Sequence, residues 1–366
     1  MSGKKPADTH HTALLWDVGT AYELFVSLHV LHEPELFDLR PSWAAKIRSR
    51  IPVTERTFLE EIYSFLNFPL EWLYNLPEPK NAISVIYSLQ HINPAERGTS
   101  LLGLVKGLKP ESKLLLKLAE RRTWDKEDLA TLIPLMCKEE GGRNHDEKAL
   151  IKYLNWWVRP EDFGNMLLSS LQAYHLAFFE QEEQRVGPVL RTGLDHARQL
   201  AEHLTVPELI SELSQGVSFD EPIGKELVLV PTFWMTPLVQ LEKVGADRQL
   251  FLFGARPSTM SAIPGELVPD GLLITLKALA DPTRLKILNY LSKEELTPSE
   301  LSRRLNLRAP TVVHHLKELR LSGLVNLTLS GQEKYYRARL EALDSTHADL
   351  KRFLTNTPAD ADESKS

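Results

Sequence analysis

The feature that most constrains the fold is a series of helix-start signals between residues 281 and 311. Asp281 stands before a proline, and Thr297 opens a Thr-Pro-Ser-Glu segment. A small polar residue followed by proline caps a helix and starts its first turn, and the Glu of the second segment completes a capping box. A further helix is expected from Arg308 after the Asn-Leu pair. The segment therefore predicts two short helices joined by a tight turn, the helix-turn-helix arrangement.

The second helix of this motif has two different faces. At 100° per residue, Val312, Leu316 and Leu319 lie together and are expected to face the core. The opposite side is centred on Pro310, His314 and Lys317, with Thr311 and Val313 flanking, and it is available to a DNA major groove. In the first helix of the domain, the buried stripe is expected to be Leu285, Leu288 and Leu291.

A β-hairpin is expected directly after the second helix. Gly323 stops the helix, an alternating strand follows from Val325, a Ser-Gly-Gln turn comes next, and a strand returns from Glu333. Such a hairpin is the wing of a winged helix, and Lys334, Arg337 and Arg339 would bring positive charge to phosphates. The alternative is that these three side chains lie on an ordinary solvent-exposed strand face and contact no DNA. The residues expected to contact DNA are Arg308, Ala309, Pro310, Thr311, Val313, His314, His315, Lys317, Gln332, Lys334 and Arg337. For His315, near the buried edge, a structural role is the stronger alternative.

The charge of the chain is unevenly distributed. The whole chain carries a formal net charge of -6, whereas residues 270–356 hold 14 Lys and Arg against 10 Asp and Glu. A modestly basic module beside an acidic body fits nucleic-acid contact confined to one end.

The remainder of the chain predicts a mainly α protein with small β elements. We expect a disordered tail at 1–12, a mostly helical regulatory domain at 13–257 with a strand pair at about 226–254, a linker at 258–269, the winged helix-turn-helix domain at 270–356 and a disordered tail at 357–366. An amphipathic helix is expected over 21–31, and two helices are expected to meet at Pro188.

The C-terminal motifs resemble the ArsR family of bacterial winged-helix repressors. The resemblance rests on Leu-Lys-Ala-Leu-Ala-Asp-Pro-Thr-Arg-Leu-Lys-Ile-Leu from Leu276, on the segments that start at Glu300 and Thr311, and on Ser-Gly-Leu-Val from Ser322. It implies a homodimer formed by the helix before Asp281 and the helix after Arg339, bound to an imperfect palindrome in double-stranded DNA. Members of the family that sense soft metals carry paired cysteines where this chain has Leu-Thr-Pro-Ser-Glu-Leu, so a thiolate site is not expected there.

The sequence gives little support for catalysis, metal binding or a membrane span. The chain has no glycine-rich nucleotide loop, no Gly-x-Ser-x-Gly and no His-Glu-x-x-His, so we expect no enzyme, catalytic residue or cofactor. Asp344 with His347, and His29 with His32, are more typical of surface chemistry than of a metal site. The seven tryptophans could line an effector pocket, although filling a large core explains them better. With one cysteine and no long apolar run, a cytoplasmic protein without a membrane span is expected. The alternative function is a winged helix used as a protein–protein interaction module.

Overall fold

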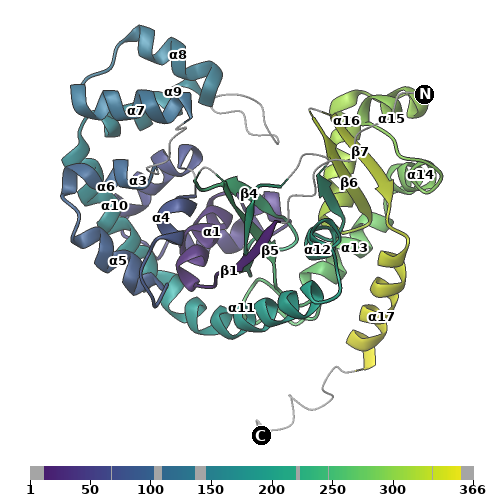
Figure 1. The fold of residues 1–366 in the computed structure, drawn as a ribbon. Helices are drawn as coiled ribbons and strands as arrows, with labels where there is room; N and C mark the ends of the chain where they lie inside the picture. Colours follow the sequence, from purple (N-terminus) through teal and green to yellow (C-terminus); the bar gives the residue numbers. More distant parts are fainter. Residues whose placement is uncertain are drawn as a thin grey trace, which may run out of the picture. The chain divides into compact units, whose positions relative to one another are not determined.

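The computed structural model of the protein describes residues 12–66, 68–102, 109–136, 146–219, 223–245, 247–331 and 333–355 (Figure 1). The chain divides into two compact units, which are described separately. The first takes the described residues up to Arg191 with Gly224–Thr232 and Gln240–Leu252, and the second takes the others. Residues 1–11 and 357–366, predicted as tails, lie outside the described part. Thr12, also placed in a tail, donates a 3.1 Å hydrogen bond to the carbonyl of Gly224.

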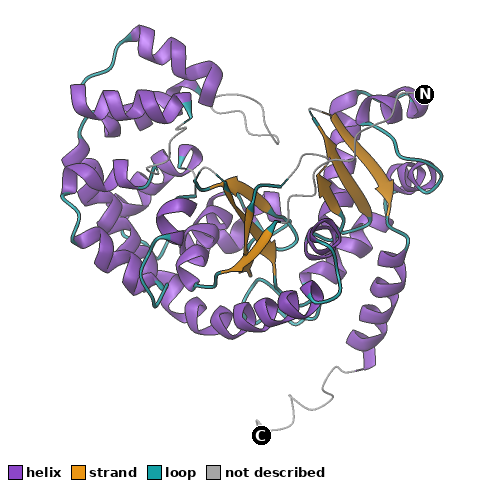
Figure 2. Cartoon of the chain, in the orientation of Figure 1, coloured by secondary structure: helices purple, strands orange, loops and turns teal. Residues whose placement is uncertain are grey.

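Most of the first unit is helical (Figure 2). Its helices are α1 (Thr20–His32), α2 (Pro41–Arg48), α3 (Val53–Ile62), α4 (Leu70–Tyr74), α5 (Ala82–Gln90), α6 (Pro94–Ser100), α7 (Pro110–Arg121), α8 (Lys126–Met136), α9 (Glu147–Trp157), α10 (Pro160–Tyr174) and α11 (Glu180–Ala201), which continues into the second unit. Short 3-10 turns occupy Pro34–Phe37 and Tyr63–Phe65. Local signals explain several starts: Asp125 accepts the backbone N–H groups of Glu127 and Asp128 at the beginning of α8.

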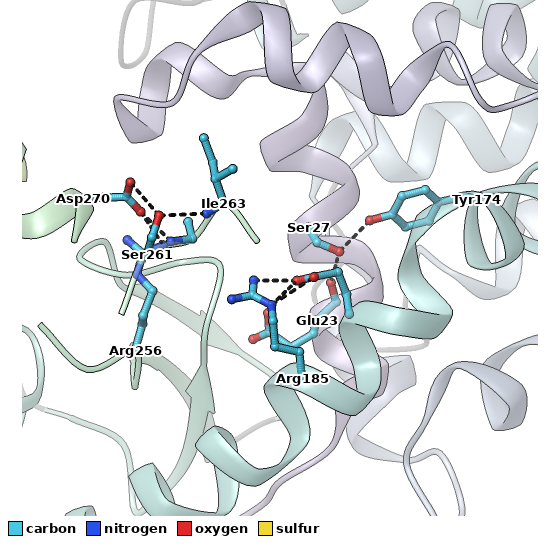
Figure 3. Close-up of polar contacts among 10 residues, drawn as sticks. Glu23, Ser27, Tyr174, Arg185, Arg256, Ser261, Ile263 and Asp270 are labelled. Atoms are coloured by element: carbon cyan, nitrogen blue, oxygen red, sulfur yellow. Dashed lines mark hydrogen bonds and ion pairs between the residues drawn. The ribbon is translucent and has the colours of Figure 1, made fainter. Parts of the chain in front are cut away.

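Helix α1 differs from its predicted amphipathic character. Every residue from Ala21 to Leu28 is buried, including Glu23. The side chain of Ser27 donates to the carbonyl of Glu23 at 2.6 Å and lies 2.7 Å from the hydroxyl of Tyr174 (Figure 3). The prediction is wrong because polar residues inside this helix meet internal partners in place of water.

The break predicted at Pro188 is also wrong. Helix α11 runs through this proline, and the irregular stretch is a π-helical turn at His175–Phe179, between α10 and α11. Proline removes one backbone hydrogen bond from a helix, but burial on both sides can compensate for that loss. Here Val186 precedes Pro188 and Leu190 and Leu194 follow it, and all three are at most 4% exposed.

The β element of the first unit is a four-stranded sheet. Its strands are ordered β1 (Ala13–Trp16), β3 (Glu226–Thr232), β5 (Arg248–Gly254) and β4 (Gln240–Lys243). β1 runs parallel to β3, and β4 runs antiparallel to β5. The predicted strand pair was therefore incomplete, and Ala13–Trp16 is a further strand within the region expected to be mostly helical. Four residues are too few to display a period, so only pairing with a distant segment defines this strand.

The second unit contains α12 (Val206–Leu213), β2 (Val217–Phe219), α13 (Asp270–Leu279), α14 (Pro282–Leu291), α15 (Pro298–Leu305), α16 (Ala309–Leu321), β6 (Val325–Ser330), β7 (Glu333–Ala338) and α17 (Glu341–Thr355). Its hydrophobic core is built by α13 to α17 with the start of β6. Residues 258–269, predicted as a linker, include the buried Ser261 and Ala262.

Two of the tryptophans considered for an effector pocket are packed inside the protein. Trp157 and Trp234 are among the largest fully buried side chains, and Trp157 contacts Phe163 at a ring distance of 5.1 Å. These two tryptophans therefore fill the interior. Within the described ranges, no helix combines the length and the apolar character needed to cross a bilayer.

Candidate nucleic-acid interface

Helices α14 and α15 begin where the capping signals predict. The Asp281 carboxylate accepts the backbone N–H of Arg284 at 2.8 Å, and this hydrogen bond lowers the pKa of Asp281. At α15, Thr297 and Glu300 form the reciprocal capping box. Asn306, with φ of 53°, ends α15, and α16 starts three residues later. The predicted helix-turn-helix is confirmed.

The core of the motif holds α16 by one face. Val312, Leu316 and Leu319 are each at most 1% exposed, as predicted. On α14, Leu291 is buried, but Leu285 is 48% exposed, so the predicted stripe is wrong at that position. Ile287 is fully buried in the core. Leu285 lies 160° from Ile287 around the helix and therefore faces away from the core.

The opposite face of α16 is open. Residues 308–311 are exposed, as are Val313 at 53% and His314. Lys317 is half-buried rather than fully exposed. The exposed residues from Arg308 at the N-cap to His314 therefore lie on the face opposite the core, and Lys317 lies between Val313 and His314 around the helix. Contact of this face with DNA stays a prediction.

His315 differs from His314. It is half-buried, and its Nδ1 is buried without a hydrogen-bond partner in the described part of the chain. Burial lowers the pKa of His315, although the nearby Asp281 carboxylate acts in the opposite direction. These surroundings favour the structural alternative for His315 over direct contact with a base.

The wing is a hairpin of β6 and β7, paired antiparallel from Val325 with Ala338 to Ser330 with Glu333. Lys334 and Arg337 are both exposed, but side chains alternate along a strand, so they project from opposite faces of β7. The guanidinium of Arg339 lies 3.4 Å from the carboxylate of Glu341, so this arginine forms an ion pair within the chain. Gln332 lies outside the described residues.

A third strand, absent from the prediction, completes the wing sheet. β2 runs parallel to β6, with Val217 opposite Leu327, and the Gly216 carbonyl accepts the Leu327 N–H at 2.7 Å. Three residues are too short to be recognised in the sequence as a strand.

Two arginines that the sequence analysis did not single out connect these elements. Arg284 donates to the carbonyls of Ala278 and Lys277, at 3.1 and 2.9 Å, and so joins α13 to α14. Arg320, 8% exposed, donates to the Ser214 carbonyl at 2.6 Å and so fixes the end of α16 to the segment before β2. Burial lowers the pKa of Arg320 to about 10. Arg284 belongs to the sequence motif around Asp281, which is the one signal that could have identified it. No neighbouring residue indicates the buried contact made by Arg320.

Apolar side chains remain uncovered on α13 and α17. Leu273 and Leu276 are 42% and 39% exposed on α13. On α17 and just before it, Leu340, Leu343 and Leu354 are 55%, 38% and 67% exposed. These leucines are gathered on two helices that contact each other, which makes them the candidate interaction surface of the second unit.

The residues considered as metal ligands do not assemble. Within the described ranges, no group of three or more His, Cys, Asp or Glu side chains is placed to hold a metal ion. His32 stacks on Tyr63, and its Nδ1 lies 2.8 Å from the Leu28 carbonyl. Burial lowers the pKa of His32 to about 4. Cys137 lies outside the described part.

Comparison with known proteins agrees with this geometry. The model of the family described as "Bacterial regulatory protein, arsR family" matches residues 281–326, from the N-cap of α14 into β6. The chain is 37% identical over 75 residues to the arsenical resistance operon repressor of Staphylococcus xylosus, a match covering 20% of this chain and 72% of that protein. It is 31% identical over 78 residues to the transcriptional repressor SdpR of Bacillus subtilis, covering 21% and 87%. It is 42% identical over 64 residues to the transcriptional activator HlyU of Vibrio cholerae, covering 18% and 59%.

Proposed function

Because this chain belongs to the ArsR family of bacterial regulatory proteins, we propose that it is a transcriptional repressor that binds an imperfect palindromic operator as a homodimer. The observation that carries the proposal is the open face of α16, whose opposite face is held in the core by Val312, Leu316 and Leu319. A helix presented in this way fits the major groove.

The residues of the open face are assigned by their chemistry. Thr311 and His314 can form hydrogen bonds to base edges, whereas Pro310 and Val313 can contact thymine methyl groups. Arg308 and Lys317 border this face and suit phosphates, as do Lys334 and Arg337 in the wing. Ala309 lies in the first turn, where the backbone can approach the DNA closely.

The homodimer is supported by the exposed leucines of α13 and α17. They lie on two helices of the same unit, and burying them requires a second apolar surface. A second copy of this chain supplies that surface by symmetry, and it also supplies the second recognition helix for a palindrome.

The signal that controls this repressor is proposed to be an organic ligand or a partner rather than a soft metal. The segment from Leu296 to Leu301 contains no cysteine, and the single cysteine of the chain is Cys137. Regulation through the N-terminal body would reach the wing along α11, α12 and β2, which follow one another in the chain and end in the wing sheet. The relatives named above are regulators, and the proposed role is not enzymatic. We propose a cytoplasmic location, because the operator DNA of a bacterium lies there.

A DNA-binding experiment tests the proposal and separates it from the protein–protein module. Fluorescence anisotropy and footprinting on the promoter of the protein's own gene should show a two-fold protected site, with affinity falling steeply as salt rises. His314→Ala should weaken specific binding about ten-fold, since a good base contact contributes about 1–3 kcal/mol. Lys46→Ala, on an exposed part of α2, is the matched control and should leave binding unchanged.

Two results would contradict the proposal. If no sequence-preferred binding occurs at low salt, the winged helix does not act as an operator reader. If His314→Ala lowers thermal stability instead of affinity, the assignment of the two faces of α16 is wrong.

A further inference from the structure

A cavity of about 500 Å³ lies in the second unit, away from the open face of α16. Its walls come from α13, α17, the end of α16 and the segment around Arg256. The volume falls in the range of small-molecule sites, about 300–1,000 Å³. Four of its lining residues, Thr236, Pro237, Arg256 and Pro257, come from the region that the sequence analysis assigned to the regulatory domain.

Arg256 is the most deeply buried of the arginines that line this cavity. Its side chain is 7% exposed, donates to the Thr236 carbonyl at 3.2 Å and lies over the ring of Phe233. Its guanidinium is 3.7 Å from Asp270 (Figure 3). That carboxylate also accepts the Ser261 hydroxyl and the Ala262 N–H, so its charge is shared among several donors. Arg256 is therefore held in place by its surroundings before any ligand arrives.

Two further arginines and several hydroxyl groups line the same space. Arg339 is 22% exposed beside Glu341, and Arg352 is 50% exposed with Asp349 as its partner at 2.7 Å. Each of the three guanidinium groups lies beside a carboxylate, and of these carboxylates only that of Asp349 lines the cavity. The pairs of Arg339 and Arg352 each include a well-exposed side chain and are therefore weak, so an incoming anion can compete for these two arginines. A negatively charged ligand could therefore take the place of Glu341 or Asp349 as the partner of these guanidinium groups.

The other part of the lining is apolar. Pro237, Met260, Ile274, Leu321 and Ala342 contribute to it. A bare inorganic anion would leave this surface wet, whereas an organic acid can bury an apolar body there and direct its carboxylate to the arginines.

The cavity is separate from the proposed dimer surface. On α17, Ala342, Thr346 and Asp349 share the face that lines the cavity, whereas Leu343 and Leu354 lie about 100° further around the helix. On α13, the lining residues Ile274 and Thr275 are similarly opposite Leu273 and Leu276. A second copy can therefore cover the leucines without filling the cavity.

The cavity also borders the end of the recognition helix. Leu321, Ser322 and Gly323 line it, and the Thr275 hydroxyl donates to the Ser322 carbonyl at 3.2 Å. A ligand in this space would contact α13, α17 and the end of α16 at once, so it could change the placement of the DNA-binding surface. We propose that this cavity binds a small organic carboxylate as the effector of the protein, an inference that rests on the proposed repressor function for its regulatory meaning.

The test uses charged probes and their uncharged counterparts on the full-length protein. Benzoate and hexanoate are titrated by calorimetry up to 10 mM (about ten times the weakest Kd expected for a ligand held by one charged contact), beside benzamide, hexanamide and inorganic phosphate. At least one acid should bind, its amide about ten-fold more weakly or not at all, and phosphate more weakly than the acid. Arg352→Gln should weaken acid binding about ten-fold, and Ala348→Trp, which fills the space, should abolish it.

Arg303→Gln is the matched control, because Arg303 is an exposed arginine of α15 that does not line the cavity. The inference is overturned if neither acid binds, if amides bind as well as acids, if phosphate binds better than both acids, or if Arg303→Gln and Arg352→Gln have equal effects. Operator binding is measured separately without any acid. Loss of DNA binding with retained acid binding would refute the repressor function alone, and DNA binding without acid binding would refute the cavity proposal alone.

Discussion

The attachment of β2 to the wing should depend on the absence of a side chain at Gly216. This residue has φ of 97°, and a Cβ atom there would lie 2.0 Å from the Asn326 Oδ1 and 3.3 Å from the Asn326 Cα. The Asn326 side chain can rotate away, but the backbone cannot. We therefore expect Gly216→Ala to strain the turn and to displace β2 from β6.

The size of the effect follows from two contributions. A left-handed backbone costs an L residue roughly 1–2 kcal/mol. The loss of the hydrogen bond from the Leu327 N–H to the Gly216 carbonyl costs about 1 kcal/mol more. The free energy that protects β6 from opening should therefore fall by about 2–3 kcal/mol, which corresponds to roughly 30- to 150-fold faster amide exchange.

Hydrogen exchange read by mass spectrometry on the peptide that covers Val325–Ser330 measures this change. Gly265→Ala is the matched control, because Gly265 also has a positive φ, of 78°, but open space where the Cβ would stand. It should leave exchange in β6 unchanged. If Gly216→Ala changes the exchange rate less than three-fold, or if both variants accelerate it equally, β2 is not held as the structure indicates.

Three further outcomes are expected. Burial lowers the pKa of His32 to about 4, so the unfolded chain binds this proton first as the pH falls. About 3 kcal/mol of stability, present above pH 6.5, should be lost between pH 6.5 and 4, and His32→Phe should remove this dependence in urea titrations. Leu316→Ala, in the core, should destabilise the second unit by about 2–5 kcal/mol in denaturant titration, whereas Val313→Ala on the open face of the same helix should stay within about 0.5 kcal/mol. Lys334→Ala should reduce the slope of log affinity against log salt by about 1 if this wing residue contacts a phosphate, and an unchanged slope would exclude it.

Several features of the candidate site could be predicted because their signals are local. A cap such as Asp281 or Thr297 acts on backbone groups two or three residues away, and the buried stripe of α16 repeats within one helix. Gly323, with φ of 68°, marks the end of that helix in the same direct way. The helix-turn-helix, the hairpin and the open face were for this reason accessible from the order of the residues.

Other features depend on segments that are far apart in the chain. No property of Val217–Phe219 or Ala13–Trp16 alone indicates a parallel strand, since the partner supplies every hydrogen bond between them. Leu285 has the spacing of a core residue but faces outward, because the direction from which neighbours pack decides which apolar stripe is covered.

The C-terminal module with which the sequence analysis began shows the same division. Its residues determine by themselves that two capped helices and a hairpin form, because capping, periodicity and turn chemistry act over a few neighbouring residues. Only the tertiary structure decides that β2 extends the wing, that Arg320 fixes the end of α16, and that Arg256 lies in one cavity with Arg352. These relations join positions tens of residues apart or more, and burial and hydrogen bonding between such positions exist only once the chain has folded.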